Sequence, residues 1–498
     1  MARGSGGADV KSTEERELKL GAGARVRLPE LPGTPLPPRT LTNVYLDTPD
    51  HRLALAGITL RRRIEAGKSR WQLKLPRGEA RLELEWNAGD SGRSARHRDR
   101  ADVPPPQMVD LVTAWSRGAA LAPVATLRSR RQGVLVRDIH GPVAEVVLDS
   151  VHVVDGSGKG TRFREIEVEQ LGGNEADLAR IEQTLRAAGA TDGDGRPKLL
   201  RALDLEPAAL PVPAAPDAPP PERVRAMIDA QLHEIVAHDP GTRLGHDPES
   251  LHQMRVACRR LRALLREAGP MLDPAWVAPL REDLAWLGDE LGAVRDLDVL
   301  RQHLSDEIAS LDVEDARGGA RLIRALESER AGLRTKLLAA LRSERYLSLL
   351  GALDEAARRP EIADPGVSLE GVARDAWKRL RKAVEGLGDE PSDEAWHAVR
   401  IKAKRARYAA ELVAPTAGKR IRRFIERAKD FQDALGEHQD AVVARGRIRD
   451  LATRARGGAS AFVAGRLLER QAARRAEILG QIHKRWRKLE KKGTKAWR

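Results

Sequence analysis

Aromatic residues and cysteine are scarce in this chain of 498 residues. Aromatic side chains make up only 3% of it, and Cys258 is its one cysteine. Proteins that bind single-stranded nucleic acid usually stack its bases on aromatic rings, so the shortage of rings argues against that class. A lone cysteine excludes an intramolecular disulfide and argues against a cysteine-based zinc site. We therefore expect Cys258 to be a small core residue.

The sequence also lacks an uninterrupted apolar run long enough to cross a bilayer. Residues 1–10 contain no apolar signal-peptide core. We therefore expect a cytoplasmic protein without a membrane partner. What the chain does have is positive charge, with a formal net charge of +14 and a pI near 10.1. Such a surplus indicates polyanionic partners, namely phosphate polymers, nucleic acid or anionic lipid.

Charged and apolar side chains alternate in the first third of the chain, with the two-residue period of a β-strand. In the first such segment Glu15, Glu17 and Lys19 point to one side, and Leu18 and Leu20 point to the other. The pattern predicts further strands at residues 43–48, 58–64, 71–75, 81–86, 126–131, 134–136, 145–149 and 163–169. Short, evenly spaced strands are typical of an antiparallel barrel or sandwich. Helices are expected at residues 107–117 and 177–188.

Two arrangements of these strands remain open from the residue pattern. The apolar faces could fill the interior and leave the charges in solvent, or the charged faces could line a shared lumen. Buried charge is costly unless it is paired, hydrated or bound to metal. Because the charged faces carry both acids and bases, the second arrangement is feasible, and the pattern alone gives the two about equal weight.

Several motifs in this region resemble those of the CYTH family, the triphosphate tunnel metalloenzymes. They are Glu-x-Glu-x-Lys at 15–19, Tyr-x-Asp-Thr at 45–48, Leu-Arg-x-Arg at 60–63, Glu-x-Glu-x-Glu at 165–169, and Lys198. The resemblance covers residues 11–203. It implies an eight-stranded antiparallel β tunnel with helices on its outside. It also implies hydrolysis of inorganic triphosphate with Mg²⁺ or Mn²⁺.

The resemblance also assigns roles to residues of this chain. Glu17 and Lys19 would be catalytic, positioning the attacking water. The metal ligands would be Glu15, Glu17, Glu167 and Glu169. Supporting groups, or ligands of a second metal, would be Glu83, Glu85, Asp149 and Glu165. The groups that bind the substrate phosphates would be Lys19, Arg61, Arg63, Lys74, Arg128, Arg130 and Lys198.

Residues 204–221 consist largely of proline and alanine. This composition predicts an extended linker. Residues 222–498 then show the Ala, Leu, Arg and Glu content and the periodicity of an all-α domain. This domain contains an internal repeat. His252 and His397 head similar motifs 145 residues apart, and Gly292 and Gly436 belong to a second pair 144 residues apart. We expect two helical-bundle repeats, at about 222–365 and 366–498, packed with pseudo-two-fold symmetry.

Each repeat carries a basic stripe along one helix face. The two stripes are His252, Arg255, Arg259 and Arg262 in the first repeat, and His397, Arg400, Lys404 and Arg407 in the second. They resemble the CHAD family of conserved-histidine α-helical domains, and the resemblance implies that these residues bind inorganic polyphosphate. The acids Asp289, Asp296, Asp433 and Asp440 would orient the arginines. The basic segment 484–498 is predicted to be a last helix docked by Trp486 and Trp497, rather than a nucleic-acid tail.

The function expected from both halves is metal-dependent hydrolysis of inorganic triphosphate, joined to polyphosphate binding and accumulation at polyphosphate granules. The alternatives are a non-catalytic polyphosphate-binding or localisation protein, a thiamine triphosphatase, and a class IV-type adenylate cyclase. A nucleic-acid binder explained by charge alone would need no divalent metal, and its affinity for any polyanion would fall with salt.

Overall fold

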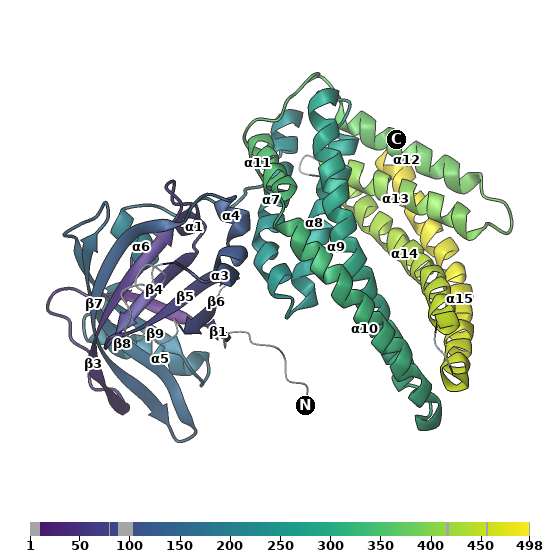
Figure 1. Ribbon diagram of the computed structural model, residues 1–498. Coiled ribbons are helices and arrows are strands. Elements are labelled where there is room, and N and C mark those ends of the chain that lie inside the picture. The colour runs from purple at the N-terminus through teal and green to yellow at the C-terminus, as the bar shows by residue number, and fades with distance from the viewer. Residues whose placement is uncertain (1–9, 79, 88–102, 415–417, 455–456, 498) are drawn as a thin grey trace. The chain divides into compact units, whose positions relative to one another are not determined.

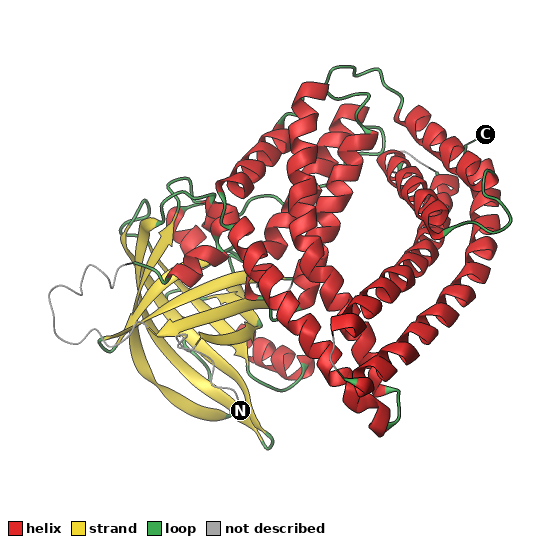
Figure 2. Cartoon of the chain, turned by 45° about the vertical axis from the view of Figure 1, so that its right-hand side comes forward, coloured by secondary structure: helices red, strands yellow, loops and turns green. Residues whose placement is uncertain are grey.

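The computed structural model in Figure 1 describes residues 10–78, 80–87, 103–414, 418–454 and 457–497. The chain forms two compact units, residues 1–210 and 211–498. Figure 2 shows that the strands belong to one unit, whereas the other is built of helices. Residues 205–219, between the last helix of the first unit and the first helix of the second, form neither helix nor strand.

The first unit contains an antiparallel sheet of ten strands in the order β1-β6-β5-β4-β3-β7-β8-β9-β2-β10. The strands are β1 (Val10–Glu15), β2 (Glu17–Gly21), β3 (Gly33–Asp47), β4 (Thr59–Glu65), β5 (Lys68–Arg77), β6 (Ala80–Asn87), β7 (Ala122–Asp138), β8 (Gly141–Asp155), β9 (Arg162–Gln170) and β10 (Thr191–Asp192). Eight strands were expected. The count differs because Arg16 divides the first expected strand into β1 and β2, and because β10 adds a two-residue strand.

The first strand segment joins the two sides of the sheet. β1 pairs with β6, whereas β2 pairs with β9, although only Arg16 separates β1 from β2. The two expected strands at 126–131 and 134–136 are one continuous strand, β7, which pairs with β3 and β8. The chain therefore brings the first and last acidic segments side by side, with Glu17 opposite Glu169 and Lys19 opposite Glu167.

Short helices accompany the sheet. They are α1 (Arg52–Leu55), α3 (Pro106–Leu111), α4 (Thr113–Ser116), α5 (Glu175–Ala187) and α6 (Lys198–Leu203). The helix expected at 107–117 is divided into α3 and α4. α5 begins at Asn174, whose side chain accepts hydrogen bonds from the backbone N–H groups of Ala176 and Asp177, as an N-cap residue does.

The apolar faces of the strands pack under α5. Leu20, Val146 and Ile166 share one buried cluster with Ile181 and Leu185 of that helix. Since successive side chains of a strand point to opposite faces, the charged residues between these apolar ones point away from α5. The structure thus selects the second of the two arrangements left open by the sequence, with the apolar faces outside.

The end of the charged interior next to α6 is apolar. Leu127 of β7 and Val151 of β8 share a fully buried cluster with Leu199 and Leu200 of α6. Leu199 also lines the charged cavity described below. The interior therefore changes from charged to apolar where α6 begins.

The second unit is helical in the residues that the structure describes. Its helices are α7 (Pro220–Leu244), α8 (Pro248–Glu267), α9 (Pro274–Ala309), α10 (Val313–Leu341), α11 (Glu344–Arg358), α12 (Leu369–Glu385), α13 (Asp393–Val413), α14 (Lys419–Arg454) and α15 (Gly458–Ala496). The basic stripes lie on α8 and α13. Two reciprocal ion pairs join these helices, Arg260 to Glu411 and Arg405 to Glu267, each at 3.0 Å. Such reciprocity is what pseudo-two-fold packing of two repeats produces.

Aromatic side chains hold the end of α15 in place. Trp486 stacks on Trp377 of α12 with ring centroids 5.7 Å apart, and Trp497 meets Phe424 of α14 edge to face. Both tryptophans are thus used in docking, as expected for a last helix. Cys258 is fully buried, and burial raises its pKa to about 12. Among the described residues, no helix combines the length and the apolarity that crossing a membrane requires.

Candidate functional site

The charged faces of the strands converge on one cavity of about 400 Å³ in the first unit. Its wall contains acids and bases from each of the strands β1 to β9, and from the start of α6. The charged residues that line it are Glu15, Glu17, Lys19, Arg39, Arg61, Arg63, Arg70, Lys74, Arg81, Glu83, Glu85, Arg131, Glu145, Glu167, Glu169 and Lys198. The period-two pattern therefore predicted most of this lining correctly.

One acidic group of the cavity is held by Lys74 of β5. Its ammonium group donates to the buried Glu15 and lies 3.3 Å from Glu83. On β2, Lys19 lies 3.0 Å from Glu17 and 4.0 Å from Glu167. Both lysines thus sit between carboxylates, where they neutralise part of the negative charge.

Lys198, the first residue of α6, is the centre of a buried ion cluster. Its ammonium nitrogen lies 2.6 Å from Asp149, 3.1 Å from Glu165 and 2.8 Å from Glu167. Arg131 adds contacts of 2.7 Å to Asp149 and 2.8 Å to Glu167. Burial alone would raise the pKa of the Glu167 carboxyl, but Lys198 and Arg131 hold this pKa well below its ordinary value. Glu167 is therefore a permanent anion whose oxygens already face two cations.

Glu169 differs from Glu167, although both point into the cavity. Burial, and after it the negative charge of Glu15, raises the pKa of the Glu169 carboxyl to about 7. Glu145 and Glu83 add to the effect, while Lys74 opposes it. This part of the cavity therefore has more negative charge than its own cations balance.

The arginines of β4 occupy the opposite kind of environment. Arg61 donates from Nε to Gln72 at 2.9 Å and from Nη1 to the Tyr45 hydroxyl at 3.2 Å. Arg63 donates to Asn43 at 3.3 Å. Burial, followed by the positive charges of Arg61 and Arg131, lowers the pKa of Arg63 to about 10. Two guanidinium groups held by neutral partners make this side of the cavity suitable for an anion.

The prediction for β7 was wrong about which arginines enter the cavity. Arg128 and Arg130 are exposed and do not line it, whereas Arg131 does. The register explains the difference, because Arg131 pairs with Asp149 and Ser129 pairs with Val151, which places the odd-numbered residues of β7 inside. Arg70 lies four residues before Lys74 in β5, so the two-residue period of the strand would also have placed it in the cavity. Nothing in the sequence indicated that Arg39 lines the cavity.

The expected supporting acids fall into two groups. Glu83 and Glu85 line the cavity. Asp149 and Glu165 are fully or almost fully buried and serve the Lys198 cluster, where Glu165 also accepts a hydrogen bond from Arg201 at 2.7 Å. In the part of the chain that the structure describes, no three His, Cys, Asp or Glu side chains are already grouped to hold a metal ion.

The two basic stripes of the second unit come together across α8 and α13. Lys404 is half-buried, and its pKa is lowered to about 7 by burial first and then by Arg400, Arg259 and Arg255, with a further effect of Arg407. The stripes of the two repeats therefore form one field of positive charge. We call Arg255, Arg259, Arg400, Lys404 and Arg407 the basic seam.

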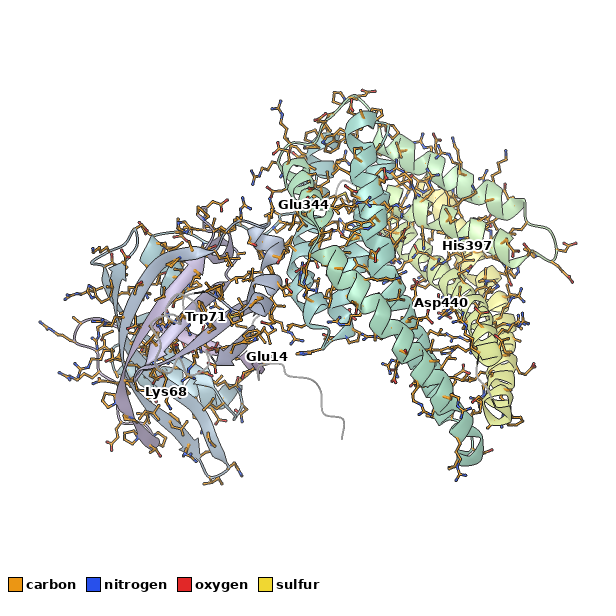
Figure 3. The ribbon with its side chains drawn as sticks, in the orientation of Figure 1. Glu14, Lys68, Trp71, Glu344, His397 and Asp440 are labelled. Atoms are coloured by element: carbon orange, nitrogen blue, oxygen red, sulfur yellow. The ribbon has the colours of Figure 1, made fainter. Side chains whose placement is uncertain are left out.

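The two histidines that begin the basic stripes, His252 and His397, lie in different surroundings. Burial and then the charge of Arg295 lower the pKa of His252, which also feels Arg259 and Arg255. His397 is exposed, and its Nδ1 lies 3.0 Å from Gln439. Figure 3 labels His397 on α13 and Asp440 on α14. Arg262 is exposed, and its charge contributes to lowering the pKa of Arg281 after burial and Arg266.

The second repeated motif positions one arginine in each repeat. Arg255 lies so close to Gly292 that an added Cβ would stand 3.3 Å from its Nε, whereas the contact of Arg400 with Gly436 is looser, at 3.8 Å from an added Cβ to its Nη2. Asp296 pairs with Arg255 at 3.0 Å, and the charge of Asp440 acts on Arg400. The other two predicted acids, Asp289 and Asp433, are exposed and form no ion pair with any residue that the structure describes.

Comparison with known proteins identifies the class to which both units point. Residues 14–197 match the CYTH domain, and residues 226–449 match the CHAD domain. The chain belongs to the family of proteins in which a CYTH domain is followed by a CHAD domain. A relative over almost the full length is "Uncharacterized protein Rv2226" of Mycobacterium tuberculosis, 33% identical over 92% of both chains.

Two solved structures are similar to one unit each. The CHAD domain from the plant Ricinus communis is 31% identical, with 55% of this chain and 94% of that chain covered and a TM-score of 0.44. A Hippeastrum protein, described as a putative adenylyl cyclase with a dominant triphosphatase activity, is 20% identical. That comparison covers 37% of this chain and 93% of that chain, with a TM-score of 0.26.

Proposed function

We propose that the first unit hydrolyses inorganic triphosphate in its charged cavity with the help of Mg²⁺ or Mn²⁺, and that the second unit binds inorganic polyphosphate along the basic seam. The observation that carries the first part is the separation of charge within the cavity, with guanidinium groups on β4 and surplus carboxylates around Glu169. A polyphosphate with its cation presents the complementary pattern of charge.

The proposal includes a closed tunnel around the substrate. The pairing of β1 with β6 and of β2 with β9 supports it, because the chain itself then bridges both sides of the sheet. The apolar cluster at α6 supports a tunnel with one closed end. A linear triphosphate fits such a shape better than a branched or bulky substrate does.

The donor set suits a hard divalent cation, which prefers carboxylate oxygens and bridges them to phosphate. Of the four expected ligands, Glu15, Glu17 and Glu169 face the region of surplus negative charge. Glu167 already forms ion pairs with Lys198 and Arg131. We therefore propose that it holds these two cations in place, in addition to any contact with the metal. When bound, the cation would supply charge neutralisation and an activated water.

The residues of the chain supply position and charge. Arg61, Arg63 and Arg131 bind phosphate oxygens, since the guanidinium fork matches them bidentately. Lys19 and Lys74 neutralise charge that develops on the transferred phosphoryl group. Phosphoryl transfer demands mainly this positioning and electrostatic stabilisation, so no covalent intermediate is required.

In the second unit, the basic seam collects five cationic side chains. Arg255 faces Asp296 at 3.0 Å and Arg407 faces Glu411 at 3.6 Å, whereas Arg259 and Lys404 have no ion-pair partner among the described residues. Burial, and after it the charges of Arg400 and Arg259, lowers the pKa of Lys404, and an anion bound in the seam would offset those charges. A long polyphosphate is suitable because it places one negative charge after another along the boundary between the two repeats.

The decisive experiment measures phosphate release from tripolyphosphate, thiamine triphosphate, ATP and long-chain polyphosphate, with and without Mg²⁺. We expect metal-dependent release with tripolyphosphate as the preferred substrate. Glu17→Ala should lower turnover by at least about a hundredfold, because a ligand of the proposed cation is lost, and with it the charge stabilisation that the cation would supply. Wild-type turnover in this variant would refute the assignment of Glu17. Absence of turnover with every substrate would favour the non-catalytic polyphosphate-binding protein.

Binding of long-chain polyphosphate tests the seam separately. The double variant Arg255→Glu and Arg400→Glu should bind it more than about a hundredfold more weakly, as expected when two charge-assisted contacts become repulsive. Tripolyphosphate hydrolysis should stay unchanged. The exposed residues Arg487 and Lys488 of α15 offer a matched control, since changing both to Glu alters the net charge by the same amount. Equal losses in the two double variants would show that charge alone determines binding.

A further inference from the structure

Three segments of the second repeat pack around one aromatic cluster. They are residues 369–385, which form α12, residues 419–431 at the start of α14, and residues 484–497 at the end of α15. The cluster uses three of the nine tryptophans and two of the four phenylalanines of the chain: Trp377, Phe424, Phe431, Trp486 and Trp497. Figure 1 shows α12 beside the end of α15. We call the outer side of these three segments the C-terminal basic surface.

This surface holds most of the net charge of the protein. The three segments contain 18 Lys and Arg residues and six Asp and Glu residues, a net charge of +12, whereas the whole chain has +14. Acids resume just beyond the segments, at Asp389, Asp433 and Glu477. The positive surplus of the composition is therefore concentrated at one end of the second repeat.

Most of these cations are available to a partner. Fifteen of the 18 are exposed. Three of the 18 form an ion pair with an acid three or four residues away: Lys378 with Asp375 at 3.6 Å, Arg381 with Glu385 at 3.1 Å, and Arg427 with Asp430 at 2.7 Å. The other cations of the surface form no ion pair with any residue that the structure describes.

The end of α15 shows how the charge is arranged. Its exposed lysines recur at three- and four-residue spacing and so share one face: Lys484, Lys488, Lys491 and Lys495. The docked face holds Trp486 and the buried Leu489 and Gly493. The last helix is thus docked through one face, as expected. Its other face carries a row of ammonium groups about 16 Å long, at 1.5 Å per residue.

The surface is not part of the machinery that the two repeats share. At the repeat offset of 144 residues, the corresponding segments of the first repeat are 225–241, 275–287 and 340–353. They contain four Arg and six Asp and Glu residues, a net charge of −2. The basic seam draws on both repeats, whereas this surplus belongs to the second repeat alone. The difference indicates a ligand other than that of the seam.

We propose that the C-terminal basic surface binds the phosphate backbone of double-stranded nucleic acid, whatever its sequence. The 18 cations are nine Lys and nine Arg, and exposed ammonium groups act as flexible point charges that suit a regular array of phosphates. A duplex is a stiff cylinder that can lie against the outer faces of several helices at once. This binding does not depend on the function proposed above for either unit.

Other polyanions suit the surface less well. Trp486 and Trp497 are held in the aromatic cluster, so they are not available to stack on unpaired bases. None of the large apolar side chains that the structure describes in the three segments is exposed, so nothing there would enter a bilayer. A thin, flexible polyphosphate fits the half-buried cations of the seam, whereas here the charges lie on outward faces.

The test measures fluorescence anisotropy of short labelled DNA duplexes of two unrelated sequences, with the full-length protein at several salt concentrations. Both duplexes should bind equally, with the logarithm of the association constant falling linearly with that of the salt concentration. Arg487→Glu with Lys488→Glu should bind more than about tenfold more weakly. Its salt slope should be smaller by about two, because each lost phosphate contact removes about 0.9. Arg487→Gln with Lys488→Gln should show the same reduction of the slope.

A matched control separates local contact from net charge. Arg317→Glu with Arg324→Glu changes two exposed residues of α10 by the same charge, and duplex affinity should stay within about twofold of wild type. Tripolyphosphate hydrolysis should be normal in all three double variants. A wild-type salt slope after substitution of Arg487 and Lys488, or equal losses in the control, would refute the proposal.

Competition identifies the polyanion. Unlabelled duplex should displace the labelled one at a lower phosphate concentration than long-chain polyphosphate or single-stranded DNA does. Displacement by polyphosphate at the same or a lower phosphate concentration would assign the surface to polyphosphate and overturn the proposal. Binding to phosphatidylserine vesicles that the substitution of Arg487 and Lys488 abolishes, without any binding to DNA, would assign the surface to a membrane and overturn it as well.

Discussion

The state of Lys404 leads to a prediction about the pH dependence of polyphosphate binding. In the free protein the pKa of Lys404 is about 7, because of burial and then the charges of Arg400 and Arg259, so the amine is half protonated at neutral pH. Phosphate oxygens in the seam would offset the neighbouring positive charges and return this pKa toward the ordinary value of 10.5. Binding is then coupled to the uptake of a proton.

The sign of the effect follows from the higher pKa of the bound state. The full contribution of Lys404 to affinity is present below pH 7 and is lost as pH rises through 7 toward the pKa of the complex. The slope approaches tenfold in affinity per pH unit, so the dissociation constant should rise by up to about a hundredfold between pH 7 and pH 9.

The assay is calorimetric titration with long-chain polyphosphate at several pH values, in pairs of buffers with different heats of ionisation. Wild-type protein should take up protons on binding above pH 7. Lys404→Arg is the matched control, because arginine keeps its charge throughout this range, and its affinity should be nearly constant from pH 7 to pH 9. The same slope in wild type and in Lys404→Arg would refute the reasoning and place the titrating group elsewhere.

Two further predictions concern the interior of each unit. Arg131→Ala should reduce tripolyphosphate turnover by about a hundredfold or more, because a cation of the cavity is lost. Arg130→Ala, on the exposed face of the same strand, should leave turnover within about twofold of wild type. Equal effects of the two variants in a phosphate-release assay would contradict the register of β7. Gly493→Ala should lower the free energy of unfolding by about 1–3 kcal/mol, because the added Cβ would stand 2.4 Å from the Trp377 ring, and an unchanged denaturant midpoint would show that α12 and α15 separate without cost.

Side-chain parity made most of the cavity predictable. Glu17 and Lys74 belong to segments where charged or polar and apolar residues alternate, so their common face was visible in the sequence, and the same odd–even phase extended to Glu15 and Arg61 although Arg16 and Arg62 interrupt the pattern. β7 was not predictable in this way, because it has arginines on both faces. The inner face of β7 is set by the apolar cluster around Leu127 at α6, which is a tertiary contact that a strand pattern does not contain.

The convergence of the two basic stripes was only partly predictable. The repeat showed that equivalent helices carry equivalent charges, but the distance between Arg255 and Lys404 depends on how α8 packs against α13. That packing is held by the pairs of Arg260 with Glu411 and of Arg405 with Glu267, whose partners lie about 140–150 residues apart in the chain.

The split of the first strand at Arg16 has a consequence for how the protein acquires its structure. β2 is synthesised long before its partner β9, which is about 150 residues further along the chain, with Glu17 opposite Glu169. Pairing over such a separation carries a large loop-closure cost and slows folding. β2 can therefore pair with β9 only after nearly the whole first unit has been synthesised, so a nascent chain halted before β9 should be unable to assemble the charged wall of the cavity.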